Sequence, residues 1–108
     1  MTSERFNEIV REQVDTCMSL LGVKGDEYDT NSNDRLHAFK AAAEIQYVTP
    51  KQALAGMMAK HTISIYDMLA NADEKPPVEK WVEKISDSIN YLLLLRAIIQ
   101  EEIDNNEA

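Results

Sequence analysis

Glycine and proline are scarce in this sequence, with three of each among 108 residues. Folds built from many short strands need frequent tight turns, which these two residues commonly form. The scarcity therefore disfavours a turn-rich β architecture.

Cysteine and long apolar runs are also nearly absent. The single Cys17 has no partner for an internal disulfide, which is typical of a reducing, cytoplasmic setting. One cysteine and two histidines also provide no zinc-binding pattern. The longest apolar run, residues 91–95, stops at Arg96, far short of the roughly 20 residues that cross a bilayer. Because Glu4 and Arg5 also interrupt any signal peptide, we expect no membrane association.

Positive charge is in short supply, with 11 Lys and Arg against 19 Asp and Glu and a net charge of -8. General nucleic-acid binders and binders of anionic membranes need a basic face, so both classes are disfavoured. A nucleotide ligand remains compatible with this charge, because a metal ion or a local basic cluster can hold phosphate.

Apolar residues recur at helical spacing in four segments, which predicts an all-α protein with one domain over residues 1–108. The first helix is expected from Ser3, as N-cap, to about Gly22, and a shorter one follows Asp34. The third has the best-marked start, because Thr49, Pro50 and Gln52 form a capping box with proline at the first helical position. After a break at 71–77, a fourth helix is expected over 77–103. These lengths predict a four-helix bundle. The second helix is expected to face inward with Leu36, Phe39, Ala42, Ala43 and Ile45.

The fourth helix is apolar on more than one side. At about 100° per residue, Glu83, Asp87 and Asn90 form a polar line, and Leu94 and Ile98 continue that line toward the C-terminus. A helix that is apolar all round must be covered all round, so we expect a homo-oligomer, a dimer or tetramer, with Leu94 and Ile98 in the contact. The opposite, main apolar side carries Trp81, Ile85, Leu92, Leu95 and Ile99.

The acidic pair on this helix is a candidate metal site. Glu83 and Asp87 are one turn apart and offer carboxylate oxygens, which Mg²⁺ prefers. Glu27, from the polar joint after the first helix, is a candidate third ligand or catalytic base. The alternative is a solvated helix face on which Lys80 and Lys84 pair with these acids.

Two further groups are candidate ligand contacts. On the third helix, Lys60 is placed to neutralise phosphate and Asp67 to hold a base or ribose. His61 is a further candidate for ligand binding, although a histidine at the edge of an apolar stripe is more often a half-buried structural residue. At the expected second helix, Arg35 and Lys40 form a local basic group. With Lys24 and Lys60 they would form a phosphate-binding rim, unless Arg35 and Lys40 simply pair with acids such as Glu44.

The polar joint over 24–33 is long for a connection within a bundle. We expect it to form a loop that closes over the ligand, with the Glu27 carboxylate on a metal or hydroxyl and the Tyr28 ring stacked on a base. The alternative is a plain solvated connector.

Four stretches together resemble a known family: KGDEYD at 24–29, DRLHAFK at 34–40, GMMAKH at 56–61 and EKISDSINYL at 83–92. They resemble small phage-type proteins related to the all-α, MazG-like nucleotide pyrophosphatases, and the nucleotide-modification-associated domains are similar. The strongest part is the acidic helix that ends in Asp87-x-x-Asn90-Tyr91.

The resemblance implies an oligomeric helical bundle that binds a nucleotide and uses Mg²⁺. We also expect Asn90 and Tyr91 to contact the ligand, and the protein to be cytoplasmic, in the host cell if a phage encodes it. This chain departs from the family's motifs, Glu-Glu-x-x-Glu and Glu-x-x-Asp: the first is reduced to Asp26-Glu27, and the second is Glu83-x-x-x-Asp87. We therefore expect either a Mg²⁺-dependent pyrophosphohydrolase, with metal-activated water attacking a phosphoanhydride, or a non-catalytic binder that sequesters a signalling nucleotide. A purely structural helical partner is the third reading.

Overall fold

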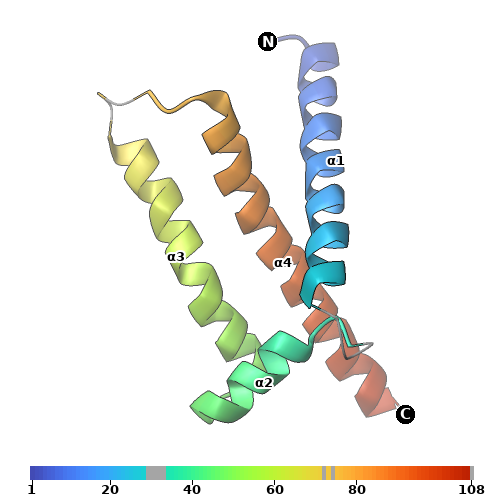
Figure 1. The fold of residues 1–108 in the computed structure, drawn as a ribbon. Coiled ribbons are helices and arrows are strands. Elements are labelled where there is room, and N and C mark those ends of the chain that lie inside the picture. The colour runs from blue at the N-terminus through green and yellow to red at the C-terminus, as the bar shows by residue number, and fades with distance from the viewer. Residues whose placement is uncertain (29–33, 72, 74, 108) are drawn as a thin grey trace.

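The computed structural model describes the backbone of residues 1–28, 34–71, 73 and 75–107, and their side chains other than 23–28 and 107. It contains four helices: α1 (Ser3–Tyr28), α2 (His37–Gln46), α3 (Pro50–Ala70) and α4 (Val78–Glu107) (Figure 1). No strand occurs in these described ranges, so the prediction of an all-α protein is confirmed.

The first helix runs past Gly22, where the sequence analysis expected it to end. Gly22 does not adopt the positive φ of a helix-ending glycine, so it does not act as a C-cap. Residues 24–28 of the expected loop are therefore helical. The side chains of Lys24, Glu27 and Tyr28 lie outside the described residues, as does the whole of 29–33.

The two middle helices start as local capping chemistry dictates. The N–H of Leu36 donates to Asp34 Oδ1 over 2.9 Å, in the turn just before α2. At α3, Gln52 N–H donates to Thr49 Oγ1, and Thr49 N–H donates to Gln52 Oε1 over 2.9 Å. The predicted capping box, with Pro50 at the helix start, is confirmed. Between the two helices, Tyr47 takes a left-handed conformation with φ of 57° and caps α2.

Helix α4 lies at the centre of the molecule, with α1 on one side and α3 on the other, while α2 crosses one end and packs on α3 (Figure 1). Gln13 of α1 contacts Ser86 of α4, and Leu21 and Leu93 line one groove farther along, so the two helices run in the same direction (Figure 1). They separate toward their N-terminal ends (Figure 1). The arrangement is therefore more open than a closed bundle.

The core lies where α2, α3 and α4 meet. Four buried side chains form it, Leu36, Phe39, Leu54 and Ile98, and Leu94 packs against them. The prediction that Leu94 and Ile98 form an intersubunit contact is therefore wrong for Ile98, which is 3% exposed within one chain, while Leu94 is partly buried against the same core. Helical periodicity identifies the apolar sides of α4, but it does not tell which side the chain's own helices will cover.

Several side chains that were predicted to lie on the main apolar side of α4 are exposed. Ile85, Leu92 and Ile99 face solvent, whereas Ser86 and Asn90 are buried. On α2, Ile45 is exposed, contrary to the expectation that it faces inward.

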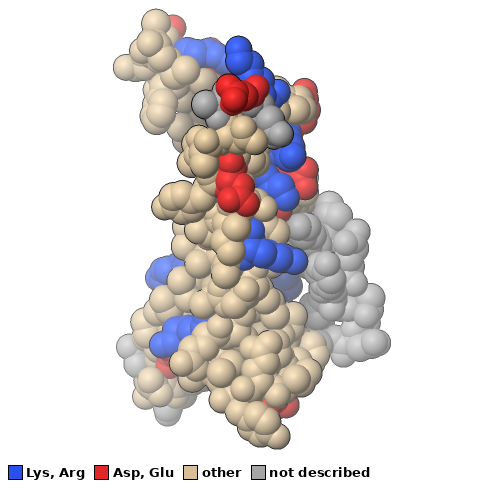
Figure 2. Space-filling view, turned by 90° about the vertical axis from the view of Figure 1, so that its left-hand side faces the viewer, with Lys and Arg blue, Asp and Glu red and all other residues tan. Residues whose placement is uncertain are grey.

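No helix in the described part of the chain is both long and apolar enough to cross a bilayer. On the outer side of α3, Lys and Arg side chains are mixed with Asp and Glu toward the end where α3 finishes and α4 begins (Figure 2). The other end of this face is mostly uncharged (Figure 2).

Candidate functional site

A polar pair joins α3 to α4 at mid-length. His61 Nδ1 lies 3.5 Å from Asp87 Oδ2, and the two side chains are only 18% and 13% exposed. An aspartate and an imidazole this close attract each other when the imidazole is protonated, and the partial burial limits screening by water. The structure thus brings together two residues that the sequence analysis assigned to separate groups.

An aromatic ring extends this pair. The Tyr91 ring, one turn beyond Asp87 on α4, lies 5.0 Å from the His61 ring between centroids, with the planes tilted by 35°. Offset and tilted arrangements at this separation are the favourable ones for aromatic pairs. His61, Asp87 and Tyr91 therefore form one contiguous cluster between the two helices.

Asn90 adds a buried amide beside this cluster. The residue is 7% exposed, and its Oδ1 has no hydrogen-bond partner. It precedes Tyr91 on α4, and Asp87 lies one turn before it. An unpaired buried carbonyl oxygen costs free energy, so its persistence needs a structural or functional explanation. Ser88 Oγ is also buried without a partner, but it lies about 160° away around α4.

The remaining predicted residues of this group lie at the rim. Lys60 and Asp67 are exposed on α3, next to His61 and about two turns beyond it. Glu83 is exposed on α4, one turn before Asp87. The group therefore has a half-buried centre and a charged, solvent-facing edge.

The basic residues of the expected phosphate rim lie elsewhere. Lys40 Nζ lies 2.6 Å from both Asp34 Oδ2 and Glu101 Oε1. Glu101 is 14 residues after Asp87 on one helix, which is about 21 Å along its axis. Lys40 therefore does not join Lys60 in one rim. It pairs with acids, as the alternative reading expected, although with these two rather than with Glu44.

These contacts perturb the titration of both partners. The hydrogen bond from Lys40, followed by that from the Leu36 N–H, lowers the pKa of Asp34 below its ordinary value. The hydrogen bonds to Asp34 and Glu101 raise the pKa of Lys40. The lysine is thus held protonated between two carboxylates.

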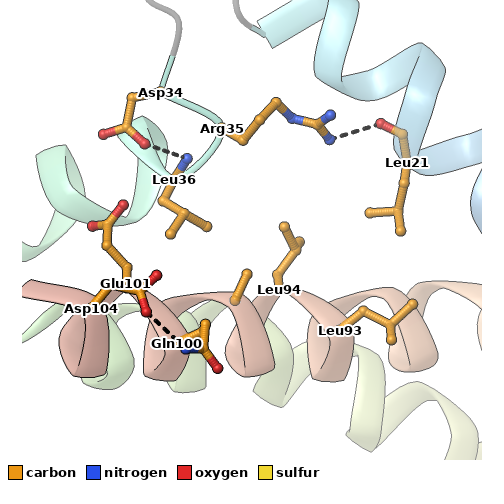
Figure 3. A pocket seen from close by; sticks show the side chains of 10 residues that line it. Leu21, Asp34, Arg35, Leu36, Leu93, Leu94, Gln100, Glu101 and Asp104 are labelled. Atoms are coloured by element: carbon orange, nitrogen blue, oxygen red, sulfur yellow. Dashed lines mark hydrogen bonds between the residues drawn. The ribbon is translucent and has the colours of Figure 1, made fainter.

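An open groove of about 640 Å³ lies at this end of α4 (Figure 3). Leu21, Leu93 and Leu94 supply its apolar surface. The Arg35 guanidinium donates to the Leu21 carbonyl over 2.9 Å, which links α1 to the segment before α2. Because the groove also carries acidic side chains, it is a poor phosphate site. These acids are Asp34, Glu101 and Asp104.

The described side chains offer a limited set of metal ligands. No group of three or more His, Cys, Asp or Glu residues among them is arranged to hold a metal ion. Glu83 and Asp87 remain a pair on one face of α4, while the proposed third ligand, Glu27, lies outside the described side chains.

A contact that was not predicted from the sequence joins α4 to α1. Gln13 Nε2 donates to Ser86 Oγ over 2.6 Å, and Ser86 is fully buried. Cys17, which is also buried, lies beside the same serine. The available signal was a glutamine flanked by apolar positions on the first helix. With Ser86 facing α1 in this way, Asn90 lies inside and Leu92 outside.

Comparisons with protein-family models, with curated proteins and with solved structures gave no match to this chain.

Proposed function

We propose that the protein binds a nucleotide at the cluster formed by His61 of α3 and by Asp87, Asn90 and Tyr91 of α4. The observation that carries this proposal is the buried, unpaired Asn90 Oδ1 beside that cluster. A carbonyl oxygen in this state accepts a hydrogen bond from any donor that reaches it. The exocyclic amino group of a base and the hydroxyl group of a ribose are both suitable donors.

The other members of the cluster suit the rest of a nucleotide. The His61 and Tyr91 rings present flat apolar surfaces against which a base can stack, and such stacking contributes about 1–3 kcal/mol per base. Lys60, exposed next to His61, provides a positive charge for phosphate. Amide, rings and cation thus lie within one region of α3 and α4.

A magnesium ion would fit this site if it were bound together with the phosphates of the ligand. Mg²⁺ is commonly held by one or two carboxylates together with phosphate oxygens, and Glu83 and Asp87 supply such a pair. When bound, the ion would neutralise phosphate charge. Asp87 also holds His61, so its carboxylate has a role with or without the metal.

A thermal-shift screen of nucleoside mono-, di- and triphosphates, each with and without Mg²⁺, tests the proposal. A ligand at 100 times its Kd stabilises the native state by about 2.7 kcal/mol. Release of phosphate or pyrophosphate, measured with the best ligand, separates a hydrolase from a binder that only sequesters the nucleotide. If no nucleotide raises the melting temperature, the proposal fails.

Two matched variants locate the site. Asp87→Asn keeps the shape and removes the charge, so nucleotide affinity should fall while the unfolding free energy changes little. Asp15→Asn makes the same change on an exposed position of α1 and should leave affinity unaltered. Equal affinity of both variants in isothermal titration calorimetry would place the ligand elsewhere.

A further inference from the structure

An apolar stripe runs along the whole solvent-exposed side of α4. Its members are separated alternately by four and three residues, which is the heptad pattern of a coiled-coil seam. Arg96 is the single interruption. The stripe consists of Val78, Val82, Ile85, Ile89, Leu92, Ile99 and Ile103.

The described part of this chain leaves much of the stripe uncovered. Val78 is 66% exposed, Leu92 55% and Ile103 42%. Single exposed apolar residues are ordinary, but a contiguous row at seam spacing marks an interaction surface. We call this row the α4 stripe.

A second exposed row on α1 faces the same side. Phe6, Val10, Val14 and Met18 are four residues apart, and all are exposed. The two helices run in the same direction and touch at Cys17 and Ser86. Viewed down the helix axes, Val14 and Met18 are rotated by about 60–100° in one direction from Cys17, and the α4 stripe is rotated in the opposite direction from Ser86. Because the two parallel helices face each other at Cys17 and Ser86, opposite rotations bring both rows to the same side of the helix pair.

The dimensions of the chain also indicate a missing neighbour. Its accessible surface is 8112 Å², whereas a folded monomer of 12.3 kDa exposes about 6,100 Å². Its radius of gyration is 16.4 Å, against about 13 Å for a compact domain of this length. The excess surface, about 2,000 Å², exceeds the ~800 Å² that each partner contributes to a standard interface.

We propose that a second copy of this chain covers the α4 stripe and the exposed row of α1, giving a two-fold symmetric dimer. A heptad seam is self-complementary, since the same row can pack against its own copy. A parallel pairing in register would place two Arg96 guanidinium groups together. The antiparallel pairing can separate the two guanidinium groups and is therefore the favoured one.

The dimer does not depend on the proposed nucleotide site. Leu92 lies about 160–180° around α4 from Asn90 and Glu83. The seam and the polar cluster are thus on opposite sides of one helix, so a second copy would not cover the cluster.

Analytical ultracentrifugation at micromolar concentrations tests the dimer. The wild type should sediment at twice the 12.3 kDa of one chain, and Leu92→Glu at the mass of one chain. Ile63→Glu is the matched control, since Ile63 is 60% exposed on the outer side of α3. It should leave the dimer intact. Circular dichroism checks that both variants keep their helices.

Arg96→Leu provides a test that does not depend on a disruptive variant. If the seam is buried, replacing its one charge by leucine should lower the dissociation constant by roughly tenfold or more. A monomeric wild type, equal disruption by Ile63→Glu and Leu92→Glu, or an unchanged dissociation constant in Arg96→Leu would each overturn the proposal.

Discussion

Replacing Asn90 by leucine should stabilise the fold while removing nucleotide binding. Leucine has the same branched side-chain skeleton as asparagine, although its two methyl groups are bulkier than the amide oxygen and nitrogen, and it carries no buried oxygen that needs a partner. The Asn90 Oδ1 is fully shielded and unpaired, and an amide group in this state costs about 1–3 kcal/mol. Asn90→Leu should therefore raise the unfolding free energy by about that amount.

The expected change in melting temperature follows from the chain length. At about 2.1 cal/mol/K per residue, the unfolding entropy of 108 residues is roughly 0.23 kcal/mol/K. A gain of about 1–3 kcal/mol then raises the melting temperature by about 4–13 °C. Differential scanning calorimetry at one fixed protein concentration measures this change, because the proposed dimerisation would make the melting temperature depend on concentration.

Asn105→Leu is the control, since it makes the same change at an exposed position of α4. It should alter the unfolding free energy by less than about 0.5 kcal/mol. A marked loss of stability in Asn90→Leu would refute this reasoning. Unchanged nucleotide affinity in that variant would remove Asn90 from the site.

Three further predictions concern the fold itself. Leu54→Ala, at 1% exposure in the core, should cost about 2–5 kcal/mol in urea unfolding; a cost below ~1 kcal/mol would contradict the core described above. Thr49→Ala removes the capping box of α3 and should cost about 0.5–2 kcal/mol, with Thr62→Ala in mid-helix as the control. The lowered pKa of Asp34 contributes stability above its unfolded-state value of 3.8, and this is lost as pH falls through the lowered pKa. The raised pKa of Lys40 contributes stability below its unfolded-state value of 10.5, which is lost as pH rises through the raised pKa. Because both groups are partly exposed, Lys40→Met should reduce the pH dependence of stability only slightly, by well under ~1 kcal/mol; unchanged pH profiles at both extremes would refute the pairing.

Local chemistry in the sequence determined the number of helices and the start of α3. Thr49, Pro50 and Gln52 satisfy the first backbone N–H groups of a helix whatever surrounds them, so the pattern can be interpreted without a fold. The end of α1 was less predictable. A glycine ends a helix only where the chain turns to a left-handed conformation, and Gly22 does not.

The sequence also identified four residues of the cluster, His61, Asp87, Asn90 and Tyr91, but not their association. His61 and Asp87 are 26 residues apart in the chain and meet only because α3 and α4 pack antiparallel. Spacing on one helix carries no information about such a contact. For the same reason, Lys40 was grouped with Lys60 although it pairs with Glu101.

The rotation of α4 was decided by tertiary structure alone. Periodicity showed that the helix is apolar on opposite sides, which led to the expectation of an oligomer. Which side faces inward depends on the contact of Gln13 with Ser86 and on the packing of Leu54 against Ile98. These contacts bury Ile98 within the chain and leave Leu92 outside, because α1 and α3 cover two other sides of α4.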